Sequence, residues 1–297
     1  MSKKEIFKGV GTALVTPFKG GRIDYQALEL LIGRQIEGGV NALIIGGTTG
    51  EAATLSDRER YSLYSFCKSL VGERVKLILG TGTNDTRLAV KHTAFASRLG
   101  CDGVLVVTPY YNKGTREGVI RHYQKIATVS DLPLILYNVP TRTGVNLDIQ
   151  ILTELIKCDN IVAIKEASDS QDRLTALSAF RDELYLYAGN DSATYSVLSL
   201  GGLGVISVVS NIYPKETAEI TKYYFDGKKE KSLLRQQSML PLIEALFLET
   251  NPAPVKYALS SLGLCKADMR LPMWLPTISC QKRITEEIRS FEAHREK

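Results

Sequence analysis

Residues 161–168 read IVAIKEAS. The segment is short, apolar and rich in β-branched residues, which is typical of a buried strand, and a polar helix start follows it. Because side chains alternate along a strand, Ile161, Ala163 and Lys165 are predicted to share one face, and the two residues between them the other. The lysine has two interpretations. It either extends its ammonium from the strand end to solvent, or it faces an interior as an amine nucleophile, largely uncharged there, that forms a Schiff base with a carbonyl substrate.

The composition is that of an ordinary soluble globular protein. Of the 297 residues, 44% are hydrophobic and 23% are charged, close to average usage. The net charge of +5 comes from scattered basic residues, so nucleic-acid binding is not expected. No apolar run is long enough to span a bilayer, so a membrane span is not expected either. Five cysteines without paired spacing and three dispersed histidines predict neither a disulfide framework nor a metal site. No cofactor is expected, and the cysteine usage favours a cytoplasmic location.

Apolar, β-rich runs recur along the first three quarters of the chain, separated by segments with helical periodicity. The predicted strands are Ala13–Phe18, Ala42–Gly47, Val75–Gly80, Gly103–Thr108, Leu134–Asn138, Ile161–Glu166, Leu184–Ala188 and Gly204–Val209. Runs that are apolar throughout suit parallel strands covered on both faces. Eight β/α units predict the α/β class and a (β/α)8 TIM barrel, in preference to an open doubly wound sheet, whose Gly-x-Gly-x-x-Gly fingerprint is missing after the first strand.

The strand pattern stops after about Asp226. Helical segments are predicted over residues 229–250, 253–262 and 281–295, with prolines between them. We therefore expect two domains, a catalytic barrel over residues 1–226 and a small C-terminal helical domain over residues 227–297.

Candidate site residues follow the predicted strands, because barrel enzymes place their chemistry at the C-terminal strand ends. The second strand leads into Gly46–Glu51, a loop with threonine hydroxyls and backbone N–H groups that suits a small carboxylate, or that is simply a tight turn. Tyr137 ends the fifth strand and is either structural or part of a proton relay beside Lys165. Arg142 follows it as a solvated loop residue or a carboxylate-binding guanidinium. Glu166 is predicted to point away from Lys165 as a structural salt-bridge partner.

Four segments in register resemble signatures of the dihydrodipicolinate synthase family, within the N-acetylneuraminate lyase superfamily. They are GTALVTPF at 11–18, GGTTGE at 46–51, YNVPTRTG at 137–144 and KEAS at 165–168. A further segment, TPYYNK at 108–113, is similar to the synthase branch. The resemblance runs from about Gly9 to the C-terminal helices.

The resemblance implies a role for each of these positions. Lys165 forms an imine with pyruvate, and the catalytic group also includes Tyr137, Thr48 and Tyr111 as a proton relay, with Tyr111 reaching in from a neighbouring subunit. The implied substrate-binding residues are Thr49, Ile206, Gly189 and Arg142. Thr49 and the backbone at Ile206 belong to the pyruvate pocket, and Arg142 receives the second substrate, aspartate 4-semialdehyde. The implied activity is pyruvate condensation to 4-hydroxy-tetrahydrodipicolinate, in diaminopimelate and lysine biosynthesis. The implied assembly is a homotetramer, a dimer of dimers.

Three alternatives remain open. Another pyruvate aldolase of the superfamily, such as an N-acetylneuraminate or keto-deoxy-sugar acid lyase, would share Lys165 and Tyr137 and differ in its aldehyde. A ligand-binding barrel without turnover is the second, and a pyridoxal phosphate enzyme, which would need a phosphate loop, is the third.

Feedback inhibition by lysine is common in this family, at a site near Asn84 and Tyr110. Inhibited members typically carry a glutamate at the position of Leu88 and histidines at those of Asp57 and Arg60. Leu88 cannot pair with an ammonium, and Arg60 adds a like charge if it faces that site, so weak or absent inhibition is predicted.

Overall fold

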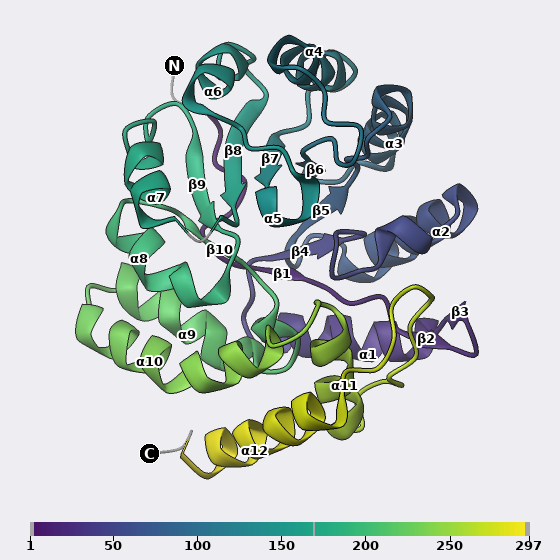
Figure 1. The fold of residues 1–297 in the computed structure, drawn as a ribbon, viewed down its shortest axis with the longest axis vertical. Helices are drawn as coiled ribbons and strands as arrows, with labels where there is room; N and C mark the ends of the chain where they lie inside the picture. The colour runs from purple at the N-terminus through teal and green to yellow at the C-terminus, as the bar shows by residue number, and fades with distance from the viewer. Residues whose placement is uncertain (1–2, 169, 295–297) are drawn as a thin grey trace.

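The computed structural model describes residues 3–168 and 170–294. Its centre is a closed barrel of parallel strands in the order β1-β10-β9-β8-β7-β6-β5-β4 (Figure 1). The strands are β1 Gly9–Ala13, β4 Ala42–Ile45, β5 Lys76–Gly80, β6 Gly103–Val107, β7 Leu134–Asn138, β8 Ile161–Glu166, β9 Tyr185–Ala188 and β10 Gly204–Ser207. The predicted (β/α)8 barrel is confirmed.

Helices alternate with the strands and surround the barrel (Figure 1). They are α1 Tyr25–Glu37, α2 Asp57–Val71, α3 Thr86–Leu99, α4 Arg116–Ala127, α6 Ile149–Leu155, α7 Gln171–Ser178, α8 Thr194–Ser199 and α9 Pro214–Phe225. Their starts follow from local chemistry. Ser56 and Glu59 form a capping box at α2, in which each side chain accepts a hydrogen bond from the other residue's backbone N–H. A short helix, α5 Pro140–Thr143, follows β7.

The first strand lies earlier in the chain than the sequence predicted. β1 ends at Ala13, and Phe18 belongs to a separate hairpin of β2 Phe18–Lys19 and β3 Arg22–Ile23. The predicted run contained Pro17, which has no N–H for a central ladder. β1 instead begins at Gly9, whose φ of +118° suits glycine.

Two apolar layers fill the molecule. One lies between the strands and the helices. The other lines the barrel interior and includes Ile44, Ile78, Ile135, Tyr137, Val162, Ala163 and Ile206, with Ile6 and Phe7 from the N-terminal segment. Residues of one strand divide between the two layers, as the alternation of a pleated strand requires.

Strand β8 departs from simple alternation at Val162. Leu134 pairs with Ile161, but the next residue of β7, Ile135, pairs with Ala163, so the register shifts by one residue. Val162 therefore packs in the interior together with Ala163, and Ile161 packs in the outer layer. The prediction that Ile161 shares a face with Lys165 was wrong, because an irregularity of this kind inserts one unpaired residue.

The C-terminal helices are α10 Lys229–Leu246, α11 Ala253–Ser261 and α12 Ile278–His294. They lie together on one side of the barrel (Figure 1), where α10 packs against α9 and α12. The predicted end of the last helix at residue 295 lies outside the described residues, and the division into two domains stays a prediction. In the described part of the chain, no helix is long and apolar enough to cross a membrane.

The five cysteines are all free, and Cys67, Cys101 and Cys280 are buried. Burial raises the pKa of the Cys67 thiol to about 12, so this side chain stays protonated and packs as a small apolar group. The cytoplasmic location expected from cysteine usage stays a prediction.

Candidate active site

Lys165 lies inside the barrel at the C-terminal end of β8. Lys165 is 5% exposed, and its Nζ lies 4.3 Å from the centroid of the Tyr137 ring. The two residues are register partners on adjacent strands, so the ladder itself fixes their proximity. Of the two interpretations of the lysine, the structure supports the interior one, because the side chain does not reach solvent.

Glu166 points to the opposite side of β8, as predicted. Its Oε2 accepts a hydrogen bond from Arg173 Nε at 3.2 Å, and its carboxylate also accepts from Asn138 Nδ2 at 3.0 Å. The Ser168 backbone N–H donates to Oε1 at 2.9 Å. These contacts tie β8 to β7 and α7, so Glu166 is a structural residue that holds the lysine-bearing strand in place.

The loop after β4 is a compact turn built from its own backbone. The N–H groups of Gly50 and Glu51 donate to Gly47 O and Thr48 O at 3.1 and 3.0 Å. Among the described residues, no hydrogen bond from the backbone N–H groups of Thr48 and Thr49 is found. Two unpaired N–H groups beside threonine hydroxyls are suited to the binding of an anion.

Gly46 starts this turn with a φ of +68°. A Cβ at Gly46 would lie 2.5 Å from the Tyr64 hydroxyl, which itself donates to Gly80 O. Glycine is therefore required here both by conformation and by space.

A buried ion pair anchors the end of the loop. Glu51 has a φ of +53°, and its Oε1 lies 2.5 Å from Lys256 Nζ of α11, with both side chains almost fully buried. Lys256 also donates to Thr16 O at 2.9 Å, and the backbone N–H of Arg270 donates to Glu51 Oε2 at 3.1 Å. Burial lowers the pKa of Lys256, while the Glu51 carboxylate opposes that shift.

Asn251, between α10 and α11, links two predicted site residues that are distant in sequence. Its Nδ2 donates to Thr49 Oγ1 at 2.9 Å, and its backbone O accepts from Arg142 Nη2 at 2.9 Å. Thr49 is buried, whereas Arg142 is exposed at the C-terminal end of α5. The structure thus brings together the loop that follows β4 and the arginine that follows β7.

Gly189 follows β9, and Ile206 lies on β10, the two strands that continue the barrel from β8 on the side away from β7. The Gly189 backbone N–H donates to Glu166 O at 2.6 Å, and a Cβ there would lie 2.5 Å from the Ala167 Cβ, so only glycine fits this close approach. Ile206 of β10 is fully buried and packs in the barrel interior with Tyr137 and Ala163.

Asp191 is a buried carboxylate near Lys165. Its Oδ2 accepts the backbone N–H groups of Val208 and Val209 at 2.9 and 3.1 Å, which fixes the turn after β10. Burial raises the pKa of Asp191, and hydrogen bonds from Ser207 and these two amides, together with the charge of Lys165, oppose that rise.

Tyr111 is not brought to this site within one chain. Tyr111 is 88% exposed and has a φ of +72°, a left-handed conformation that is uncommon for a bulky residue. The neighbouring Asn112 anchors the loop by donating from Nδ2 to Asn84 O at 3.0 Å. Thr48 is partly exposed on the loop beside Thr49.

Two residues of this site were not predicted from the sequence. Asp191 stood at a predicted strand end but was not singled out, and Asn251 stood in a proline-rich connection, Asn251-Pro252-Ala253-Pro254. A short polar residue before a proline between two helices is the only sequence signal for Asn251. Its contacts depend on how the C-terminal helices pack on the barrel.

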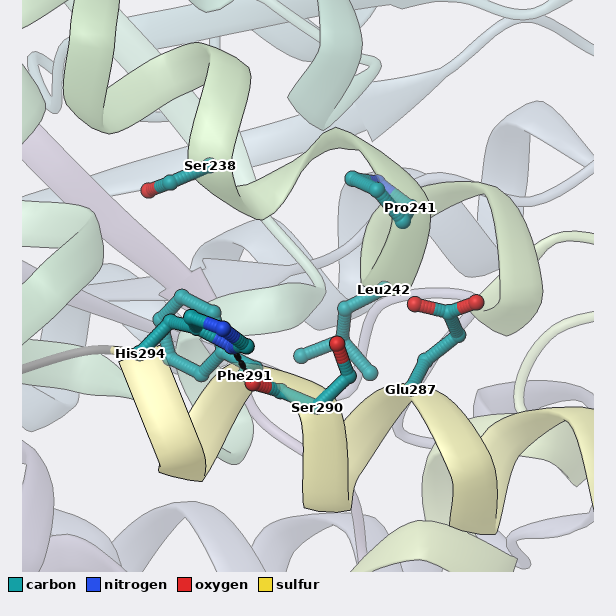
Figure 2. A pocket seen from close by; sticks show the side chains of 7 residues that line it. All are labelled: Ser238, Pro241, Leu242, Glu287, Ser290, Phe291 and His294. Atoms are coloured by element: carbon teal, nitrogen blue, oxygen red, sulfur yellow. Dashed lines mark hydrogen bonds between the residues drawn. The ribbon is translucent and has the colours of Figure 1, made fainter.

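A separate groove of about 240 Å3 lies between α10 and α12. Figure 2 shows that its walls come from these two helices, with His294 Nδ1 hydrogen-bonded to Ser290 O at 2.7 Å. None of the predicted site residues lines it. The lining residues are Ser238, Pro241, Leu242, Glu287, Ser290, Phe291 and His294.

The fold and the site define a class, the (β/α)8-barrel proteins that carry a lysine inside the barrel at the end of their sixth strand. The sequence model of the dihydrodipicolinate synthetase family matches residues 6–290. The chain belongs to this family.

Individual relatives agree over almost the whole chain. A 4-hydroxy-tetrahydrodipicolinate synthase of Clostridium novyi is 45% identical over 269 residues, which cover 90% of this chain and 91% of the relative. The crystal structure of a dihydrodipicolinate synthase from Thermotoga maritima matches with a TM-score of 0.93 at 42% identity, over 97% of this chain and 99% of that chain. The structure of the Acinetobacter baumannii enzyme in complex with pyruvate matches with a TM-score of 0.93 at 38% identity, over 96% and 99% of the two chains.

Proposed function

We propose that this chain is a Schiff-base-forming lyase that condenses pyruvate with L-aspartate 4-semialdehyde to give 4-hydroxy-tetrahydrodipicolinate, in diaminopimelate and lysine biosynthesis. The observation that carries the proposal is the buried Lys165 amine at the end of β8, 4.3 Å from the Tyr137 ring centroid. The names of its relatives, at 45% identity, support the same reaction, and one solved relative is a pyruvate complex.

In the proposed first half-reaction, the Lys165 amine attacks the keto carbon of pyruvate. Water leaves and an imine forms. The unpaired amides of Thr48 and Thr49 bind the pyruvate carboxylate, and this contact holds the keto carbon near the amine. The imine is an electron sink, so the pyruvate methyl group loses a proton to the relay of Tyr137, Thr48 and Tyr111 and becomes an enamine.

In the proposed second half-reaction, the enamine carbon attacks the aldehyde carbon of aspartate semialdehyde, and the relay returns a proton to the new alkoxide. Arg142 binds the carboxylate of this substrate with its guanidinium. The substrate amine then attacks the imine carbon, which closes the ring and releases Lys165 as a free amine. No external oxidant or reductant is needed, because the condensation and the ring closure leave the overall oxidation level unchanged.

The competing function is another pyruvate aldolase of the superfamily, which would use the same lysine with a different aldehyde. Arg142, held beside Asn251, favours an aldehyde that carries a carboxylate. The deciding experiment is a coupled assay of the purified protein with pyruvate and aspartate semialdehyde, run beside an assay with N-acetylneuraminate. Turnover with the first pair is expected. Cleavage of N-acetylneuraminate without condensation would assign the competing function.

We also propose that the active species is a homo-oligomer, with a tetramer as the expected form. The support is Tyr111, which is 88% exposed in a left-handed backbone conformation. A strained, exposed tyrosine on an anchored loop is suited to insertion into a neighbouring subunit.

A further inference from the structure

We propose that Asn251 is a positioning residue that sets both carboxylate-binding sites of the reaction, the Thr49 loop for the first substrate and Arg142 for the second. This inference rests on the proposed function and extends it to a residue outside the barrel strands. Asn251 is 6% exposed and contacts each site through a different group. Its side-chain Nδ2 donates to Thr49 Oγ1 and its backbone O accepts from Arg142 Nη2, each at 2.9 Å.

The contact with Thr49 determines the direction in which that hydroxyl donates. A threonine hydroxyl has one proton and two lone pairs. Because Asn251 Nδ2 occupies a lone pair of Thr49 Oγ1, the hydroxyl proton stays available for a donor role toward another acceptor. A bound carboxylate is such an acceptor, so the amide of Asn251 orients Thr49 as a donor to the first substrate.

The contact with Arg142 couples the second site to the first. Arg142 lies on the four-residue helix α5 and is exposed, so its long side chain has many accessible rotamers. The hydrogen bond to Asn251 O restricts these rotamers to those that keep the guanidinium beside Asn251, the residue that also contacts Thr49. One residue therefore fixes the spacing between the two carboxylate sites.

The loop itself is held by other contacts. Glu51 is paired with Lys256 and accepts from the Arg270 backbone, and Thr16 Oγ1 donates to Gly50 O at 2.7 Å. The Asn251 side chain is thus not required to fold the loop, and its Oδ1 has no hydrogen-bond partner among the described residues. A change of the Asn251 side chain is therefore expected to alter the direction of one hydroxyl more than the fold.

Two substitutions separate orientation from packing. Asn251→Ala removes the donor to Thr49, and the KM for pyruvate is expected to rise about 3- to 10-fold, as for the loss of one hydrogen bond. Asn251→Asp keeps the shape but replaces the donor with an acceptor, which draws the Thr49 proton away from the substrate and adds a negative charge. The KM for pyruvate of this variant is expected to rise about 10- to 100-fold.

The pH dependence of Asn251→Asp gives an independent readout. A buried carboxyl beside a bound anion has a raised pKa, so lowering the pH protonates it and restores a donor. The ratio of the KM for pyruvate of Asn251→Asp to that of the original protein is therefore expected to decrease as the pH is lowered from about 8 to about 6. The same ratio for Asn251→Ala is expected to stay constant.

The control is Asn160→Ala, at the opposite end of the barrel just before β8. Asn160 Nδ2 donates to Ala127 O and Ser130 O at 3.0 and 2.7 Å, so its loss also removes partly buried amide contacts. This variant is expected to keep the KM for pyruvate of the original protein, even where its melting temperature falls.

The proposal is overturned if Asn251→Asp binds pyruvate as well as Asn251→Ala does, or if neither variant changes the KM. If Asn251→Ala does not fold, Asn251→Asp at two pH values carries the same test. Failure of the original protein to turn over pyruvate and aspartate semialdehyde would instead contradict the proposed function. In that case the role of Asn251 at the first site is tested without the second substrate. The amount of pyruvate trapped by borohydride on each variant is measured as a function of the pyruvate concentration.

Discussion

Tyr137 and Lys165 are register partners on β7 and β8, and the lysine Nζ lies 4.3 Å from the tyrosine ring centroid. Both side chains lie inside the barrel and both residues are less than 8% exposed. The strand ladder therefore holds an amine and a phenol together before any substrate binds. This arrangement suits proton transfer to and from an imine, which needs the acid or base to be in place.

The substitution Tyr137→Phe tests this role. It removes only the hydroxyl and keeps the ring that packs against Lys165, so the fold is expected to be retained. The turnover rate is expected to fall about 10²- to 10⁴-fold, the usual contribution of a general acid or base. Steady-state kinetics with both substrates, together with far-UV circular dichroism, measure the two effects. Turnover close to that of the original protein would reduce Tyr137 to a packing residue.

Much of the fold was predictable because strand type and spacing are local properties. Predicted strands at residues 134–138 and 161–166 coincide with β7 and β8. The first strand was misplaced, because apolar character continues past β1 into a loop and a hairpin. The register shift at Val162 depends on pairing with β7 and leaves no mark in the sequence of β8.

The site was predictable where a residue follows a strand and not where tertiary packing places it. Lys165 and Tyr137 occupy barrel positions that alternation along their strands indicates. Asn251 reaches Thr49 across 202 residues, and the partner of Glu51 is Lys256, 205 residues away. No pattern within either segment specifies those contacts, because they arise only when the C-terminal helices pack on the barrel.

Stability is expected to depend on pH through His122. Burial lowers the pKa of His122 to about 4; its Nδ1 contacts Thr86 Oγ1 at 2.9 Å, and its Nε2 has no partner among the described residues. Because this pKa lies below the value of about 6.5 for an unfolded histidine, the unfolded chain binds the proton first as the pH falls. The contribution of neutral His122 to the free energy of unfolding is thus fully present above about pH 6.5. It is lost as the pH falls toward about 4, and the loss amounts to about 3 kcal/mol.

The measurement is urea unfolding at several pH values within that window. His122→Gln is expected to reduce the acid-induced loss of stability, although His92, whose pKa burial also lowers to about 4, retains part of it. His294→Gln is the matched control, because His294 is exposed. An unchanged pH dependence in His122→Gln would show that protonation of this residue is not coupled to unfolding.

Weak or absent inhibition by lysine is expected. Arg60 is buried, and its guanidinium is held within the chain, because its Nη2 donates to Ala52 O at 2.8 Å and its Nη1 to Gly80 O at 3.3 Å. The Asp57 carboxylate is already paired with Lys91 at 2.6 Å. Leu88 is 40% exposed on α3 and supplies no charge for an ammonium.

Lysine titration into the coupled assay at subsaturating pyruvate measures this inhibition. Little loss of rate is expected in the original protein. Leu88→Glu is a gain-of-function variant that restores the missing carboxylate and is expected to increase sensitivity. Strong inhibition of the original protein at submillimolar lysine would contradict the prediction.

Catalysis is expected to require at least a dimer, because Tyr111 is exposed in the single chain. Sedimentation at the assay concentration is expected to show an oligomer, with a tetramer as the main species. Mixing Tyr111→Phe with Lys165→Ala subunits is expected to restore part of the activity, since a mixed pair contains one site with both residues intact. A fully active monomer would contradict a role for Tyr111 across an interface.

Lys165 is expected to be the amine that forms the imine with pyruvate. Incubation with pyruvate and borohydride, followed by peptide mass analysis, identifies the lysine that reacts. Lys256 is an internal control, because it is also buried but is paired with Glu51 at 2.5 Å. We expect inactivation and one reduced pyruvyl adduct, on the peptide that contains Lys165. An adduct on Lys256 or any other lysine, with Lys165 unmodified, would contradict it.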